Sequence, residues 1–295
     1  MNEGPSPAFH RLGLLAGEAA VEALGKTRVI VFGLGGVGSW AAEALVRSGI
    51  GRLTIVDNDS VCVTNINRQV QALETTIGLP KAAALMKRLL EINPRCDVRA
   101  FNRAFTRESA PVFEIEKAAY VIDAIDSLTH KLDLIETAAG PLGKGAPGNA
   151  KGLSPVFFSS MGMASRLDPS RIKTADIWKS SGCPLAALVR RGLRKRGFTG
   201  HFTVVYSDEP VTRAGAESPC GTEHCFCSRR DTEWCSSKKI INGSVVTVTA
   251  PAGMILAGLV IRDVIRRTGA GGEGNRESRG AGFPEHHPGK EAPHG

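Results

Sequence analysis

The first part of the chain contains a glycine-rich turn and an aspartate of the types that bind nucleotides. An apolar run at 29–32 is followed at once by four glycines: Gly33, Gly35, Gly36 and Gly38. Such glycines let the backbone turn tightly and approach a ligand, and the next helix presents free N–H groups to an anion. Asp57 ends the next apolar run, about twenty residues further on, where a carboxylate can accept ribose hydroxyls. Close helix–strand packing has the same glycine requirement, so the pattern indicates a nucleotide site without proving it.

Two cations and a further carboxylate indicate phosphates rather than a dinucleotide. Arg68 lies in a polar connection, and Lys81 lies in the first turn of an expected helix, where the helix dipole favours an anion nearby. Asp126 follows an expected strand and suits Mg²⁺, although capping of the next helix is an alternative role. A hydride-transferring dehydrogenase would need only the glycine turn and Asp57. Cations together with a metal carboxylate suit a triphosphate, so the residues favour ATP over NAD.

Short apolar runs alternate with helical stretches and must position these residues. They predict an α/β fold that is doubly wound and Rossmann-like, with a mainly parallel sheet and helices on both faces. Strands are expected at 29–32, 53–56, 97–101, 119–124, 155–160 and 202–206. Helices are expected at 12–24, 80–92, 107–117 and after Ser127, which can cap; 243–268 is expected to be a strand followed by a helix.

The chain is expected to form one domain over 1–268, with a basic insertion at about 171–200 and a cysteine-rich loop at about 210–239. The Gly-, Pro- and charge-rich tail 269–295 is expected to be disordered. No secretory signal is recognisable, which favours a cytoplasmic protein. The stretch 245–261 has no charged residue, which is one feature of a membrane-spanning helix. Its threonines and proline favour a buried or subunit-interface element instead, so membrane association is not expected.

Basic residues exceed acidic ones, with a formal net charge of +8 and an isoelectric point of about 9.3, which suits a polyanionic partner. Five basic residues cluster near the end of one expected helix: Arg190, Arg191, Arg194, Lys195 and Arg196. A helix dipole favours cations there, but five in seven positions exceed what capping needs. Contact with a nucleic-acid backbone is therefore favoured over a merely solvated face.

The seven cysteines, in a chain without a recognisable export signal, are read as reduced thiols or metal ligands. Four of them follow the spacing C-x4-C-x-C-x7-C, which leaves zinc binding and unligated thiols both open: Cys220, Cys225, Cys227 and Cys235. Cys183 could act as a thioester nucleophile. Since no base partner is visible, a loop thiol is favoured.

Five motifs occur in order: GLGGVGSW, LTIVDND, VTNINRQ, GLPKA and VIDAIDS. Together they resemble the ubiquitin-activating-enzyme-like adenylating family over about 11–140. The resemblance implies ATP in the glycine turn, Asp57 on the ribose, and phosphate contacts from Asn65, Arg68 and Lys81. It further implies Asp126 at Mg²⁺ and a homodimer in which Arg11 reaches the phosphates of the other protomer. The implied reaction is attack of a carboxylate on the α-phosphate, giving an acyl-adenylate and pyrophosphate.

A further stretch, SRLDPSRIKTADIWKS, resembles the branch of that family that dehydrates threonylcarbamoyladenosine in tRNA. The threonyl carboxylate would be adenylated, and the neighbouring carbamoyl group would close a ring with loss of AMP. The basic cluster would then contact the tRNA backbone.

The alternative is the branch that adenylates the C-terminal glycine of a ubiquitin-like sulfur carrier, whose members usually carry two C-x-x-C pairs for zinc. A sulfur-transfer or redox partner stays open. A non-catalytic nucleotide-sensing or RNA-binding module would have no use for Arg68, Lys81 and Asp126 together.

Overall fold

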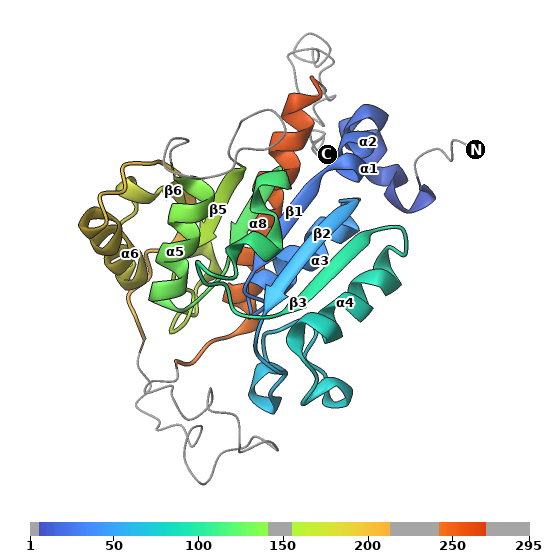
Figure 1. Cartoon of the computed structure of the whole chain (residues 1–295). Coiled ribbons are helices and arrows are strands. Elements are labelled where there is room, and N and C mark those ends of the chain that lie inside the picture. Colours follow the sequence, from blue (N-terminus) through green and yellow to red (C-terminus); the bar gives the residue numbers. More distant parts are fainter. Residues whose placement is uncertain (1–5, 141–154, 213–241, 270–295) are drawn as a thin grey trace, which may run out of the picture.

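The computed structural model describes residues 6–140, 155–212 and 242–269. Their strands form one seven-stranded sheet in the order β3-β2-β1-β4-β5-β7-β6, in which the only antiparallel pair is β6 with β7. The strands are β1 (Arg28–Phe32), β2 (Arg52–Asp57), β3 (Asp97–Asn102), β4 (Tyr120–Asp123), β5 (Val156–Ser160), β6 (Ile172–Asp176) and β7 (Thr203–Ser207). The predicted doubly wound, mainly parallel α/β fold is confirmed (Figure 1).

Helices cover both faces of the sheet. On one face lie α3, α4 and α8, and on the other α5 and α6 (Figure 1). Their bounds, with those of the two N-terminal helices, are α1 (His10–Ala16), α2 (Glu18–Lys26), α3 (Gly38–Arg47), α4 (Lys81–Ile92), α5 (Leu128–Ala139), α6 (Pro184–Lys195) and α8 (Val246–Arg267). Short 3₁₀ helices are η1 (Pro7–Phe9), η2 (Val63–Asn65), η3 (Glu74–Thr76), η4 (Ala110–Phe113), η5 (Ile115–Lys117), η6 (Pro169–Arg171) and η7 (Ile177–Lys179).

Alternation along the strands divides the core into two layers. Val29 and Val31 of β1 pack under α3 and α8, whereas Ile30 and Phe32 face the layer of α5 and α6. The strand order reverses between β1 and β4, because the chain runs outward in opposite directions from these two strands. Ligands of open α/β sheets bind outside the carboxyl ends of the strands at such a switch point. The glycine turn after β1 and Asp126 after β4 flank it.

The prediction of a helix at 107–117 is wrong. The structure has two 3₁₀ helices there, η4 and η5, separated by Glu114 in the left-handed conformation with φ of 51°. Pro111 lacks a backbone N–H, and a left-handed residue cannot continue a right-handed helix. The connection from β3 to β4 therefore lacks an α-helix.

Two other expectations about helices need correction. The segment at 12–24 is divided into α1 and α2 at Gly17, which has φ of 83°. No strand precedes α8 within 242–269, because the β-branched residues at its start are already helical and Val248 packs into the core. Pro251 is accommodated inside the helix.

The segment at about 171–200 is joined to the sheet more closely than an insertion implies. It contributes β6, an edge strand that the sequence did not reveal, and α6, whose Ala186, Val189 and Leu193 are fully buried. Ser127 precedes α5 as expected, but its side chain makes no capping hydrogen bond. Most of the cysteine-rich loop at 210–239 and nearly all of the tail 269–295 lie outside the described residues.

Helix α8 is long and apolar enough, by length and composition, to cross a membrane. It packs instead along α3 and contacts α2, β5 and β7. Val248, Ala252, Leu256 and Val260 recur every four residues and are fully buried. The predicted core role of this stretch is confirmed for that face of the helix.

Candidate active site

The glycine turn joins β1 to α3. Gly33 has φ of 85°, and a Cβ there would lie 2.6 Å from the Ala124 carbonyl oxygen. A Cβ on Gly38 would lie 1.8 Å from the carbonyl oxygen of Gly33. Close packing between the turn and the end of β4 therefore requires these two glycines. A Cβ on Gly35, by contrast, would meet nothing within 4 Å, so the turn borders open space there.

Asp57, at the end of β2, holds the turn in place. Its carboxylate accepts hydrogen bonds from the Leu34 N–H at 2.6 Å and the Asp59 N–H at 2.8 Å. Burial raises the pKa of Asp57, and the positive charge of Lys81 opposes that rise. This structural task was not expected from the sequence, which assigned Asp57 to a ribose.

Lys81 begins α4 and is buried, with 6% of its surface exposed. Its ammonium group forms an ion pair with Asp59 at 2.7 Å. Burial disfavours the charged form, but Asp57 and Asp59 outweigh it, so the pKa of Lys81 is raised. The lysine is therefore a cation at neutral pH. The sequence analysis expected an anion near Lys81. Within the fold, Asp59 supplies one, and the sequence had not identified it as the partner.

Asp126 lies close enough to both Lys81 and Arg68 for its charge to interact with theirs. Burial lowers the pKa of the Arg68 guanidinium, while the charge of Asp126 acts in the opposite direction. Asp126 also raises the pKa of Lys81, and its side chain is exposed. Arg68 donates to the Thr64 carbonyl oxygen at 2.8 Å. The fold thus brings together the two cations and the carboxylate that the sequence singled out.

Hydrogen bonds join the connection that carries Arg68 to the glycine turn and the helix that follows it. Asn65 is buried, and its Oδ1 accepts the Cys62 N–H at 3.0 Å, which stabilises η2. The Trp40 indole donates to the Arg68 carbonyl oxygen at 2.9 Å, and the Gln71 amide donates to the Leu34 carbonyl oxygen at 2.8 Å. Sequence reasoning missed Trp40 and Gln71. Their position inside or beside the glycine and VTNINRQ motifs was the available signal.

A buried ion pair lies beneath the end of β4. Lys131 of α5 and Asp123 are both 0% exposed, and their charged groups are 2.6 Å apart. The lysine also donates to Ser159 Oγ at 3.2 Å and the Ser160 carbonyl oxygen at 3.0 Å. Asp123 accepts the Ile125 N–H at 3.0 Å, so the network sets the backbone that leads directly into Asp126.

Arg11 lies far from the glycine turn of its own chain. It is exposed on α1, whose preceding residue Phe9 packs near Gly49, beyond the last residue of α3. The turn is at the first residue of α3, about 15 Å away for a ten-residue helix. Within one protomer, the fold does not bring Arg11 to the other candidate residues.

The basic cluster on α6 divides into paired and unpaired cations. Arg196 pairs with Asp133 and Glu136, both at 2.7 Å. Arg190 donates to Ser180 Oγ at 2.5 Å, and Arg194 stacks over Trp178. The remaining two are exposed and have no side-chain partner among the described residues: Arg191 and Lys195. The surface available to a polyanion is therefore narrower than the run of five suggested.

Of the cysteines singled out in the sequence, the structure describes only Cys183. Cys183 is a buried free thiol at the start of α6, with 3% exposure, which does not suit an accessible nucleophile. Cys220, Cys225, Cys227 and Cys235 lie outside the described residues. Within the ranges that the structure covers, no cluster of three or more His, Cys, Asp or Glu could hold a metal ion.

A helix N-terminus, a buried cationic lysine, an arginine and an exposed carboxylate converge at the switch point. Together with the fold they define a nucleotide-binding α/β protein. The chain belongs to the ThiF family, whose model matches residues 10–278.

The chain resembles two dehydratases over most of its length. It is 36% identical over 260 residues to the tRNA threonylcarbamoyladenosine dehydratase of Bacillus subtilis, covering 88% of this chain and 94% of the relative. The solved structure of the E. coli tRNA N6-threonylcarbamoyladenosine dehydratase, TcdA, in complex with ATP superposes with a TM-score of 0.72 at 30% identity. That match covers 92% of this chain and 100% of the other.

A relative from the sulfur-carrier branch matches about half of the chain. The molybdopterin-synthase adenylyltransferase of Salmonella typhimurium is 35% identical over 139 residues, which cover 46% of this chain and 55% of the relative.

Proposed function

We propose that the protein uses ATP to dehydrate threonylcarbamoyladenosine in tRNA through a carboxyl-adenylate. The observation that carries this proposal is the convergence of Arg68, Lys81 and Asp126 beside the N-terminus of α3. Full-length similarity to dehydratases, one of them solved with ATP, supports the choice of substrate over a sulfur carrier.

The carboxylate of the threonyl group attacks the α-phosphate of ATP and displaces pyrophosphate. Lys81 and Arg68 bind the phosphates and stabilise the negative charge that builds up on them. Asp126 would hold Mg²⁺, which neutralises phosphate charge when bound. The carbamoyl group then attacks the activated carbonyl and closes a ring. AMP leaves with one oxygen of the original carboxylate, and the nucleoside has lost one water.

Asp57, Asn65 and the glycine turn bind the nucleoside and phosphate ends of ATP in this proposal. Asp57 keeps free lone pairs for a ribose hydroxyl while Oδ2 accepts from Leu34 of the turn and Oδ1 accepts from Asp59. Open space beside Gly35 leaves room for the ligand. The reaction takes place in the cytoplasm, where tRNA is found.

A homodimer would complete the site with Arg11 of the second protomer. Two large apolar side chains on the same short helix support this arrangement, since Leu14 and Leu15 are 75% and 85% exposed. Burying them against a second copy would bring Arg11 to the interface.

Arg191 and Lys195 are proposed to contact the tRNA backbone. They are four residues apart and share one face of α6. Charge reversal of both should weaken tRNA binding and leave ATP binding unchanged. Lys87→Glu is the control, because Lys87 is exposed on α4, which covers the other face of the sheet, and has no described side-chain partner. Unchanged tRNA affinity in the double variant would contradict this role.

The function is tested by AMP release from ATP and Mg²⁺ with two substrates in parallel. One is tRNA that carries threonylcarbamoyladenosine, and the other is a ubiquitin-like sulfur carrier. The proposal expects AMP with the tRNA and none with the carrier. AMP formed only with the carrier would contradict it and assign the chain to the sulfur-carrier branch.

A further inference from the structure

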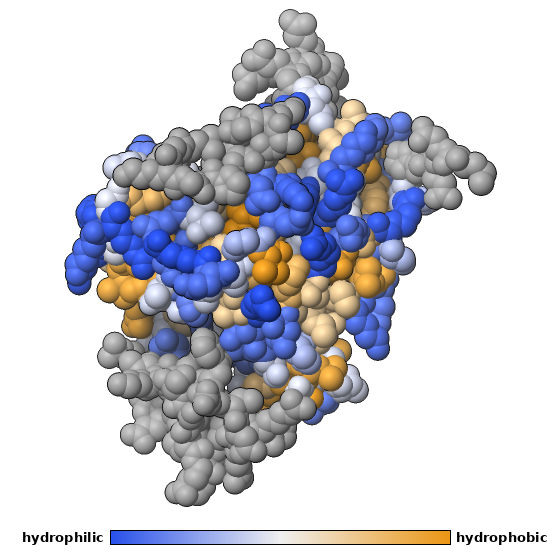
Figure 2. Space-filling model, in the orientation of Figure 1, coloured by the Kyte–Doolittle hydropathy of each residue, from blue (hydrophilic) through white to orange (hydrophobic). Residues whose placement is uncertain are grey.

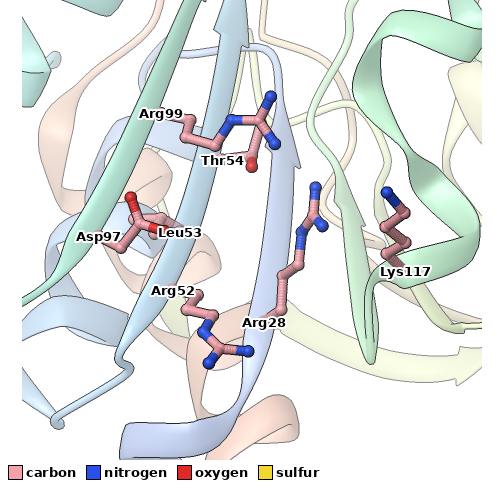
Figure 3. A pocket seen from close by; sticks show the side chains of 7 residues that line it. All are labelled: Arg28, Arg52, Leu53, Thr54, Asp97, Arg99 and Lys117. Atoms are coloured by element: carbon pink, nitrogen blue, oxygen red, sulfur yellow. The ribbon is translucent and has the colours of Figure 1, made fainter.

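A second basic site lies at the opposite end of the sheet from the glycine turn. A cavity of about 230 Å³ opens where β1, β2 and β3 begin (Figure 3). Its lining consists of Arg28, Arg52, Leu53, Thr54, Asp97, Arg99 and Lys117. Figure 3 shows that Arg28, Arg52 and Arg99 extend from neighbouring strands, while Lys117 approaches from the segment beside them. We call the four cations of this lining the cation pocket.

The cation pocket is open because of the unusual connection between β3 and β4. The helices that pack on β2 and β3 are α3 and α4, and both cover the other face. On the pocket side, η4 and η5 replace the expected crossover helix and leave the start of these strands accessible. In the orientation of Figure 1, hydrophilic and hydrophobic residues are mixed at the centre of this face, and hydrophilic residues gather towards α6 (Figure 2).

The cation pocket carries uncompensated positive charge. Glu114 accepts hydrogen bonds from Lys117, from Arg99 at 2.8 Å and from Arg28 at 3.3 Å. These cations, Lys117 first, lower the pKa of Glu114 to about 2. The side chain of Arg52 has no hydrogen bond or ion pair in the part of the chain that the structure describes. Four cations thus face two carboxylates, those of Glu114 and Asp97.

We propose that the cation pocket binds phosphates of an RNA backbone outside the catalytic site, an inference that rests on the proposed tRNA substrate. The one apolar residue of the lining, Leu53, has its side chain buried in the core layer under α3 and α8, and the lining has no aromatic ring on which a base could stack. We therefore expect the pocket to recognise phosphates rather than bases.

Exposure favours a polyanion over a small free anion. The side chains of Arg99 and Lys117 are 44% and 58% exposed, so water and salt screen their attraction to a single ion. RNA gains from counterion release at every phosphate that it places on the protein. The pocket also shares its face of the sheet with α6, which carries the exposed Arg191 and Lys195.

The distance between the two ends of the sheet suits an extended RNA. The five residues of β1 span roughly 17 Å. That corresponds to on the order of five phosphates along one strand of a duplex. An anticodon arm whose loop reaches the carboxyl ends of the strands can therefore place its stem phosphates near the cation pocket.

The test measures tRNA affinity at a series of salt concentrations by fluorescence anisotropy. Arg52→Glu is the main variant, because Arg52 is exposed and unpaired among the described residues, so its replacement should not disturb the fold. Lys117→Glu is the second variant. Lys87→Glu supplies the same charge change on the other face. Glu114→Gln removes a negative charge from the pocket and should therefore raise the affinity for tRNA, whereas the other two pocket variants should lower it.

Each pocket variant should raise the Kd for tRNA by at least about eightfold at 0.1 M salt, since one phosphate contact contributes a slope of about 0.9 in log Kd against log salt. The slope should become shallower by about one. Glu114→Gln should bind more tightly and Lys87→Glu should match the unaltered protein. AMP release at saturating tRNA should persist in Arg52→Glu.

Unchanged affinity and salt slope in both pocket variants would overturn the inference, as would an equal loss in Lys87→Glu. Failure of the proposed function would be recognised separately, because the unaltered protein would then release AMP only with the sulfur carrier.

Discussion

The buried pair of Lys131 and Asp123 gives the sharpest prediction about stability. Both side chains are 0% exposed, and the lysine makes three hydrogen bonds. Lys131→Met removes the positive charge and leaves Asp123 with the Ser159 hydroxyl at 2.6 Å and the Ile125 N–H. Breaking a buried pair by removing one partner costs about 3–5 kcal/mol. For a domain of this size, that corresponds to a fall of about 6–20 °C in Tm.

Urea unfolding followed by circular dichroism, at fixed protein concentration, measures this effect. Lys87→Met is the matched control, because it replaces an exposed lysine with no described side-chain partner and should change stability by no more than about 0.5 kcal/mol. Asp123→Asn combined with Lys131→Met should be less destabilising than the sum of the single variants, since the two residues interact directly. A Lys131→Met protein within about 1 kcal/mol of the unaltered one would refute the reasoning.

Three further predictions concern the glycine turn, pH dependence and the dimer. Gly33→Ala should abolish ATP binding, measured by calorimetry, because φ of 85° and the Ala124 carbonyl oxygen exclude a Cβ; Gly25→Ala, with open space, is the control. Glu114→Gln should lower stability at pH 7, and the difference should shrink as pH falls from 4.5 towards about 2, because the carboxylate of Glu114 contributes only while ionised; a difference at pH 2.5 as large as at pH 7 would contradict this. Mixing inactive Arg11→Ala and Lys81→Met proteins should restore about a quarter of the activity through mixed dimers, whereas no recovery would contradict a role for Arg11 in the second protomer.

The sequence predicted the central strands and the site near the switch point well, because local signals specify them. The runs at the centres of β1, β2 and β4 are buried on both faces and are apolar apart from Thr54, as is typical of buried parallel strands. Asp57 ends a strand, Asp126 lies three residues after one, and Lys81 opens a helix. Their position at the carboxyl ends of the strands could therefore be inferred from the order of the elements alone.

Elements whose structure depends on distant packing were predicted less well. Strand β6 is a partly exposed edge strand with little apolar pattern, and its pairing with β7 crosses some thirty residues. The β-branched start of α8 resembles a strand, but a face of small and apolar residues packs along α3 and keeps it helical. Tertiary contacts override local propensity in both cases.

The buried charges show which signal could have been used. Lys131 lies in the apolar stripe of α5, three residues after Leu128 and four before Ile135, so its burial could have been inferred from helical spacing. The pairing of Lys81 with Asp59 joins residues 22 apart and depends on how the connection folds back over β2. No periodicity in the sequence records such a contact.

Transfer of oxygen tests the central claim most directly. Threonylcarbamoyladenosine in tRNA is prepared with a heavy oxygen isotope in its carboxyl group and is incubated with ATP, Mg²⁺ and the protein. The AMP is then analysed by mass spectrometry. A carboxyl-adenylate predicts AMP that carries one heavy oxygen, together with a nucleoside lighter by one water. Unlabelled AMP, or ADP and phosphate as products, would contradict adenylation of the carboxylate.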